Sequence, residues 1–285
     1  MLRSMYSGIS GMKNFQVKLD VIGNNIANVN TYGFKKGRTT FKDLVSQQIA
    51  GASEATATRG GVNPKQVGLG SQLSTIDTVH TQGSLQNTAR PLDLGISGDG
   101  FFRLGTGTIA AAGGVKGINI TLSETTYSRA GNFYLDQEGY IVNSDGKYLL
   151  GPVGTPATTS VAIKIPTDAK SFSVGADGTV NYIDKDGKLT KAGQIELAKF
   201  SNNEGLEKAG SNEYRASTNS GNPLPSYPGG TGGAGTLVAG ALEMSNVDLS
   251  EEFTEMIVAQ RGFQANTRII TTSDEILQEL VNLKR

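Results

Sequence analysis

The chain has 285 residues, of which 37% are hydrophobic, and its 26 basic side chains balance 26 acidic ones. This length supplies one or two ordinary cores, and the zero formal net charge excludes the general basicity that indicates nucleic-acid binding. Because cysteine is absent, disulfides and thiolate metal sites are excluded, and the chain could work outside a cell without forming wrong disulfides.

The first predicted element is an N-terminal helix within residues 1–34. Its apolar side chains recur at steps of three or four, which places them on one helical face that needs a partner. They are Leu2, Met5, Ile9, Met12, Phe15, Leu19, Ile22, Ile26 and Val29. Residues 1–13 lack the apolar run of a secretory signal peptide, and no stretch reaches the roughly 18 apolar residues of a membrane span. We therefore expect no membrane insertion and no cleaved signal peptide.

Three asparagines, Asn24, Asn25 and Asn28, interrupt this stripe. Asparagine is a poor helix former that prefers caps and turns. We expect a packed partner to satisfy these side chains, either within one subunit or between neighbouring subunits.

The middle of the chain is predicted to be an extended linking segment, 35–70, followed by a central all-β domain, 71–245, without a large outer insertion. Turn dipeptides lie beside short runs of alternating β-formers and predict hairpins in series. They are Asp99-Gly100, Glu138-Gly139, Asp145-Gly146, Asp177-Gly178 and Asp186-Gly187. The stretches 50–61, 105–117 and 219–236 consist mainly of small and polar residues and are predicted to be loops.

A second helix is predicted within residues 246–285. Asp248 can accept the backbone N–H of Glu251, which predicts the helix start. Apolar residues then follow a heptad pattern with polar interruptions. The apolar positions are Phe253, Met256, Phe263, Ile270, Leu277 and Val281, and the polar ones are Gln260, Thr267 and Asp274. Because residues 1–36 are basic overall and residues 246–285 are acidic, we expect the two ends to pair, in one molecule or between neighbours.

The sequence offers no convincing chemistry. His80 is the only histidine, so a histidine-based metal site or a catalytic triad would rest on it alone; a surface or capping role is expected instead. The run Asp184 to Gly187 begins like a calcium loop, but Ile195 occupies the position of the bidentate glutamate. Acids such as Asp136 and Glu138 are also common turn residues. We expect no enzyme activity, no cofactor and no metal.

Segments at both ends carry a family resemblance. The runs Leu19 to Asn28 and Thr31 to Lys35 resemble the N-terminal signature of the bacterial flagellar axial proteins, which are the rod and hook subunits. The runs Ala241 to Leu249 and Met256 to Arg261 resemble the closing signature of the same family.

The resemblance continues in the β region. Pro91 to Phe102 and Tyr127 to Phe133 look like the β-domain motifs of the same family, so the resemblance covers nearly the whole chain. It implies an α+β fold in which the N- and C-terminal helices pair as a coiled coil around which the all-β domain lies.

What the resemblance implies functionally is a homopolymer in the form of a tube, exported by the flagellar type III apparatus. Other axial proteins would adjoin it at each end, namely the rod, the hook–filament junction and the hook cap. The residues expected to pack subunits together are Leu19, Ile22, Asn24, Asn25, Ile26, Asn28, Phe253, Met256, Gln260, Phe263, Ile270, Leu277 and Val281.

Two subunits of the family are compatible with the sequence. Residues 24–28 and the closing segment look most like the hook subunit, which forms the curved tube that transmits torque from rod to filament, and this is the expected function. Residues 46–68 resemble the extra piece of the distal rod subunit, which is the alternative, and the short stretch 151–160 leaves no room for the outer domain of many hook proteins. A secreted β-rich adhesin or a glycan-active enzyme is a remote alternative.

Overall fold

The computed structural model describes residues 2–283 with the exceptions of 57, 108–124, 154–158 and 231. The chain forms two compact units. The helical unit consists of Met1–Ala27, Gly37–Val79 and Val247–Arg285, and the β unit consists of Asn28–Lys36 and His80–Asn246. The two terminal helices and the β-rich centre confirm the predicted α+β class, and the described residues contain no large insertion domain.

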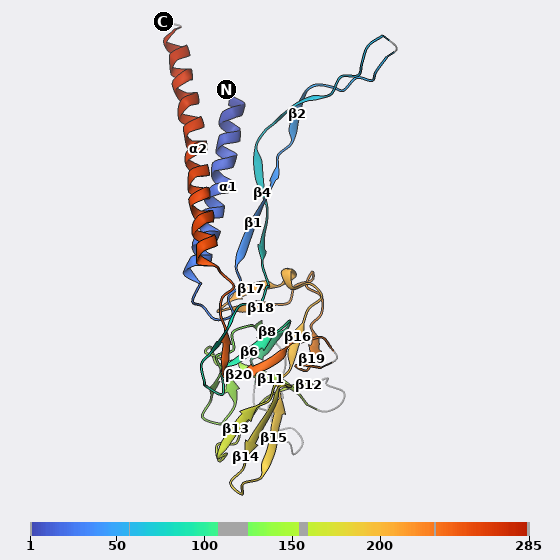
Figure 1. The fold of residues 1–285 in the computed structure, drawn as a ribbon, viewed down its shortest axis with the longest axis vertical. Helices are drawn as coiled ribbons and strands as arrows, with labels where there is room; N and C mark the ends of the chain where they lie inside the picture. Colours follow the sequence, from blue (N-terminus) through green and yellow to red (C-terminus); the bar gives the residue numbers. More distant parts are fainter. Residues whose placement is uncertain (1, 57, 108–124, 154–158, 231, 284–285) are drawn as a thin grey trace. The chain divides into compact units, whose positions relative to one another are not determined.

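The helical unit combines two antiparallel helices with two antiparallel strand pairs (Figure 1). Its helices are α1 (Leu2–Ala27) and α2 (Leu249–Asn282). Its strands are β1 (Gly37–Asp43), β2 (Ser46–Ala50), β3 (Lys65–Gly68) and β4 (Ser71–Thr78). Strand β1 pairs with β4, and β2 pairs with β3. Helix α1 lies beside both α2 and the β1–β4 ribbon, since the Asn14 amide donates to Ser71 Oγ at 2.8 Å.

The start of α2 and the end of α1 each have a local cause. Asp248 accepts hydrogen bonds from the backbone N–H groups of Ser250 at 2.8 Å and Glu251 at 3.4 Å, which confirms the predicted start of α2. Helix α1 ends at Ala27, before the expected limit at residue 34. The chain then turns, and Gly33 adopts a φ of 69°, a left-handed conformation that glycine takes without strain.

The observed units differ from the expected boundaries in three places. Residues 71–79, expected in the β domain, belong to the helical unit because β4 pairs with β1. Residues 28–36, expected in the first helix as far as residue 34 and in the linking segment after it, belong to the β unit. Asn246, expected in the second helical segment, also belongs to the β unit. The expected linking segment contains strands β1, β2 and β3, of which β1 packs on α1.

The described residues of the β unit form one large antiparallel sheet and three smaller ones. The large sheet has the order β17-β18-β8-β7-β11-β10-β9, with β12 on β11, β16 on β7 and β19 on β16. Its strands are β7 (Phe101–Gly105), β8 (Thr125–Ser128), β9 (Tyr134–Leu135), β10 (Ile141–Val142), β11 (Tyr148–Val153), β12 (Thr159–Ala162), β16 (Leu197–Lys199), β17 (Glu207–Gly210), β18 (Glu213–Arg215) and β19 (Leu224–Ser226).

The smaller sheets have the orders β13-β14-β15, β20-β6 and β21-β5. Their strands are β5 (Leu85–Asn87), β6 (Leu94–Ser97), β13 (Ser171–Val174), β14 (Thr179–Ile183), β15 (Leu189–Gln194), β20 (Thr236–Ala239) and β21 (Ala241–Glu243); a short 3-10 helix, η1, spans Asn203–Gly205.

Four of the five predicted turn dipeptides connect paired strands. Gly139, Gly146, Gly178 and Gly187 lie in the turns of successive hairpins, with φ values of 86°, 77°, 78° and 78°. The prediction for Asp99-Gly100 was wrong. This dipeptide connects β6 to β7, which belong to different sheets, so here the chain passes from one sheet to another.

The predicted loops are only partly described, and one of them contains a strand. Most of 105–117, half of 151–160 and the last two residues of the chain lie outside the described residues. The stretch 219–236 contains β19, which pairs only with β16 among the described strands. Pro225 is tolerated in β19 because an edge strand needs fewer backbone donors.

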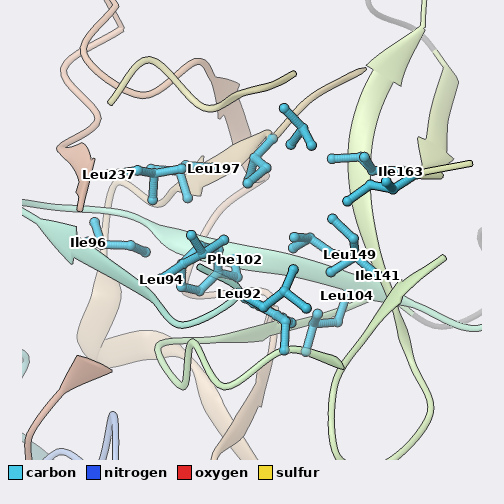
Figure 2. Packing of buried hydrophobic residues seen from close by; sticks show 14 of the residues in the cluster. Leu92, Leu94, Ile96, Phe102, Leu104, Ile141, Leu149, Ile163, Leu197 and Leu237 are labelled. Atoms are coloured by element: carbon cyan, nitrogen blue, oxygen red, sulfur yellow. The ribbon is translucent and has the colours of Figure 1, made fainter. Parts of the chain in front are cut away.

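The core of the β unit surrounds β7, whose consecutive residues Phe101 and Phe102 are both buried. Side chains alternate across a strand, so these two rings enter different clusters. Phe102 packs edge-on against Phe133 at 5.1 Å in the larger cluster, which Figure 2 shows with its surrounding leucines and isoleucines. Phe101 joins Tyr127, Phe200 and other residues on the opposite side. The central strand is therefore covered on both faces.

His80 lies in this second, aromatic region, so the expectation of a surface or capping role was wrong. Its ring centroid lies 5.7 Å from that of Phe101 and 5.5 Å from that of Tyr214. The pKa of His80 is lowered from 6.5 to about 4, mainly by burial and in smaller part by the positive charges of Lys35 and Arg129. His80 therefore packs as a neutral aromatic ring.

Replacing His80 with Phe should remove one pH dependence of stability. The unfolded chain binds a proton at His80 more readily than the folded chain does. The contribution of neutral His80 is therefore complete above pH 6.5 and is lost as the pH falls towards about 4, by up to about 3 kcal/mol. Urea unfolding followed by tyrosine fluorescence at about pH 7 and about pH 4.5 measures the effect.

The carboxylates titrate alike in both proteins, so they cancel in the comparison. His80→Phe should lose less stability than the parent between the two pH values. An equal loss in both proteins would contradict the buried, neutral state of His80.

Candidate assembly interface

The two helices of the helical unit meet along a seam of heptad spacing. On α2, the buried and half-buried positions recur at alternating steps of four and three. They are Glu252, Met256, Ala259, Phe263, Asn266, Ile270, Ser273 and Leu277. The facing positions of α1 are Gly8, Gly11, Phe15, Ile22 and Asn25, which run in the opposite direction.

Small residues bring the helices close together. A methyl group at Gly11 would lie 2.9 Å from the side-chain amide of Asn266, and one at Gly262 would lie 2.5 to 2.9 Å from three atoms of the Phe15 ring. Such distances are shorter than ordinary van der Waals contact, so a side chain at Gly11 or Gly262 would force Asn266 or the Phe15 ring to move.

A polar contact fixes one end of the seam. The Asn25 side-chain amide donates to Glu252 Oε2 at 3.1 Å and to the Gly37 carbonyl at 2.9 Å. Its oxygen accepts the Gly37 N–H at 2.9 Å. Asn25 therefore joins α1, α2 and the beginning of β1, and within this chain its side chain is satisfied. Lys18 and Glu255 form an ion pair near the same end. Buried polar contacts of this kind specify helix register.

The expected packing residues fall into three groups. Ile22 and Asn25 are buried in the helical unit, whereas Asn28 lies in the β unit and accepts a hydrogen bond from the Thr31 hydroxyl at 3.2 Å. The half-buried members are Leu19, Ile26, Asn28, Met256, Phe263, Ile270 and Leu277. The exposed members are Asn24, Phe253, Gln260 and Val281.

The observed seam shares only alternate positions with the predicted heptad. Where Gln260, Thr267 and Asp274 were expected, the preceding residues Ala259, Asn266 and Ser273 face α1 instead. Glu252 likewise takes the place of Phe253, which is 51% exposed. Hydrophobicity alone misses such positions because small residues and amides suit close helix contact.

The glycines of the helices carried the missing signal. Glycine in a helix interior costs about 1 kcal/mol relative to alanine, so Gly8 and Gly11 in α1 and Gly262 in α2 indicate close backbone approach. These three glycines would have indicated the seam, although Gly23, a fourth helical glycine, has nothing within 4 Å of the position that a methyl group would take and lies outside it.

Helix α2 also carries apolar side chains that face away from α1. We call them the outer strip: Val258, Ala265, Ile269, Ile276, Leu280 and Leu283. Ile276 is 44% exposed and Val258 is 56% exposed. Their separations of seven, four and three residues keep them on one side of the helix. Contiguous exposed apolar surface on a helix typically marks a site of protein association.

The β2–β3 hairpin adds a second exposed apolar surface. Val45, Ile49 and Val67 are exposed in and beside this hairpin. Val45 is 79% exposed and Ile49 is 64% exposed. An isolated two-stranded ribbon is only marginally stable in water, so this hairpin needs a partner.

Neither helix in the described part of the chain is long and apolar enough to cross a membrane.

Three protein-family models match the chain. Residues 5–35 match the model described as "Flagella basal body rod protein". Residues 118–182 match "Flagellar hook protein FlgE/F/G D1 domain", and residues 238–283 match "Flagellar basal body rod FlgEFG protein C-terminal". The terminal matches contain the seam residues of both helices.

Individual relatives match over the full chain. The flagellar basal-body rod protein FlgG of Bacillus subtilis is 60% identical over 285 residues, covering 100% of both chains. The protein of the same name in Borreliella burgdorferi is 36% identical over 290 residues, again covering 100% of both. The flagellar hook protein FlgE of Borreliella burgdorferi is 31% identical over 442 aligned positions, with 100% of both chains covered.

Replacing Gly262 with Ala should weaken the helix pair. The added methyl group raises helix propensity by up to about 1 kcal/mol, but its clash with the Phe15 ring costs about 1–3 kcal/mol. We therefore expect a lower melting temperature in circular dichroism at 222 nm.

Gly23→Ala is the matched control, because nothing lies within 4 Å of a methyl group at that position in α1. It should raise the melting temperature. An equal rise for Gly262→Ala would show that the helices are farther apart than described.

Proposed function

Because this chain belongs to the bacterial family of flagellar rod and hook proteins, we propose that it is a structural subunit of the flagellar basal-body rod, in its distal part. The observation that carries the proposal is the 60% identity to the FlgG rod protein of Bacillus subtilis along the entire chain. The subunit polymerises with copies of itself into a tube.

The hook, expected from the sequence, has less support than the rod alternative. Identity to the hook protein of Borreliella burgdorferi is 31%, and that alignment runs over 442 positions against 285 residues here. The hook protein therefore contains residues without a counterpart in this chain. FlgG relatives align over 285 to 290 positions and need no such insertion.

The features that favoured the hook lie in parts common to rod and hook proteins. The closing segment falls within the model whose name covers FlgE, FlgF and FlgG together, and residues 24–28 fall within a rod-protein model. Neither discriminates between the two subunits. The segment 46–68, which resembles the extra piece of the distal rod subunit, spans the β2–β3 hairpin and is consistent with the rod proposal.

The exposed surfaces of the helical unit supply the contacts between subunits in this proposal. Ile270 lies against Gly8 of α1 in the same chain, and Phe263 occupies a half-buried position of the same seam, so both serve the subunit's own helix pair. The outer strip and the exposed residues Phe253 and Val281 remain accessible to neighbouring copies. Burying an exposed Ile or Val side chain contributes about 1.5–3 kcal/mol, and a polymer repeats this gain in every subunit.

The partners follow from a position in the rod. Other axial proteins adjoin the polymer at its ends, and the flagellar type III apparatus exports the chain without cleaving a signal peptide. The hook cap and the hook–filament junction were expected for a hook subunit and are not part of the rod proposal. The adhesin and glycan-active alternatives lose support because the full-length relatives are named as rod and hook proteins.

Deleting the chromosomal gene tests the proposal. Electron microscopy of isolated basal bodies should reveal rods that stop short and carry no hook, because the distal rod is missing. A plasmid copy should restore full rods. Full-length rods without hooks would assign the protein to the hook, and intact motile flagella would refute an axial role.

The same strain tests the outer strip. Ile276→Asp introduces a charge at a side chain that is 44% exposed, so the subunit should fold while rod completion and motility fail. Gln264→Asp, at an exposed position of α2 outside the strip, should restore motility. Normal motility with Ile276→Asp would contradict the role of the strip.

A further inference from the structure

The chain passes between its two units at four peptide bonds, those that follow Ala27, Lys36, Val79 and Asn246. Beside three of these bonds lie residues that are hydrogen bonded to one another inside the β unit. We call these four points the crossings. They are far apart in the sequence, but residues beside three of them are hydrogen bonded to the same partners.

Glu243, at the end of β21, is the centre of this arrangement. Its Oε1 accepts hydrogen bonds from Lys35 Nζ at 2.6 Å and from the Gly83 N–H at 2.9 Å. Its Oε2 accepts one from Arg129 at 3.1 Å, and its carbonyl oxygen accepts the Gly33 N–H at 2.8 Å. One residue thus binds the segments 28–36 and 80–83, which precede and follow different crossings.

Two further side chains complete the set. Lys35 Nζ also donates to the Thr81 carbonyl at 2.8 Å. The Asn246 oxygen accepts the Lys36 N–H at 2.7 Å, and its amide donates to the Thr81 hydroxyl at 2.9 Å. Each of the three crossings is therefore bonded directly to the other two.

The charges make the arrangement cooperative. The side chains of Lys35 and Glu243 have no exposed surface, and that of Arg129 is 4% exposed. Removing an ion from water costs several kcal/mol, which close partners must offset. If one segment leaves, the others retain a buried charge without its partner. Partial opening is therefore costly, and the segments favour opening together.

We propose that Lys35, Thr81, Glu243 and Asn246 form a joint, by which we mean a hydrogen-bonded set that attaches the three chain connections to the β unit. The three connections then detach from the β unit and reattach to it together. Force that passes from one unit to the other along the chain is then shared among three connections instead of reaching each anchor separately. This mechanical consequence rests on the proposed function in a torque-transmitting rod, whereas the joint itself does not.

Hydrogen exchange of the full-length chain with Asn246→Ala tests the joint. This change removes the side-chain acceptor of the Lys36 amide. The reporters are the amides of Gly33, Gly83 and Met244, whose acceptors are Glu243 and Ser84. We expect all three to exchange about tenfold faster together, while amides of the central strand β7 keep the rate of the parent protein.

Asn143→Ala is the matched control. Asn143 also makes three side-chain hydrogen bonds and is also half-buried, but it lies in the turn between β10 and β11. It should leave the three reporters unchanged. Acceleration confined to residues 241–246 of the Asn246→Ala chain would overturn the joint, as would equal acceleration throughout the β unit. Neither result depends on the basal-body images, so the joint and the rod assignment can fail separately.

Discussion

A buried carboxylate, that of Glu243, holds two buried cations and a backbone amide from parts of the chain far apart in sequence. Burial lowers the pKa of Lys35, and the adjacent Glu243 opposes this by favouring the charged ammonium. Arg129 adds a second positive charge on the other carboxylate oxygen. Because isolated charges are so costly in a protein interior, these contacts determine where both terminal segments attach to the β unit. Helix α1 ends shortly before Lys35, and helix α2 begins shortly after Glu243.

Local signals predicted much of the fold. Asp248 and Glu251 predicted the start of α2, and four glycine turns predicted hairpins, because caps and turns depend on neighbouring residues. Contacts between distant residues were missed. Lys35 and Glu243 are 208 positions apart, and each looks like an ordinary charged residue in the sequence. The seam was half correct for a related reason: Met256 and Phe263 stand out as apolar, whereas the role of Ala259 depends on the helix opposite it.

The closed helix pair gives meaning to the surfaces that remain outside it. Glycine contacts and Asn25 hold α1 against α2 within one chain, and apolar side chains of α2 still face outward. A domain that functioned alone would gain nothing from that exposure, but a polymer buries it at every repeat. The terminal runs common to rod and hook proteins are those that build the pair, so they identify the family without distinguishing its members.

A double-mutant cycle with Lys35→Met and Glu243→Gln tests the central claim most directly. The free energy of unfolding of the β unit is measured for the parent, both single variants and the double variant. The account predicts that each single change costs about 3–5 kcal/mol, because it leaves the other buried charge without its partner. The double variant should lose less than the sum of the two single losses by more than about 1 kcal/mol, because both charges of the Lys35–Glu243 pair are then removed. Losses that add to within about 0.5 kcal/mol would contradict it.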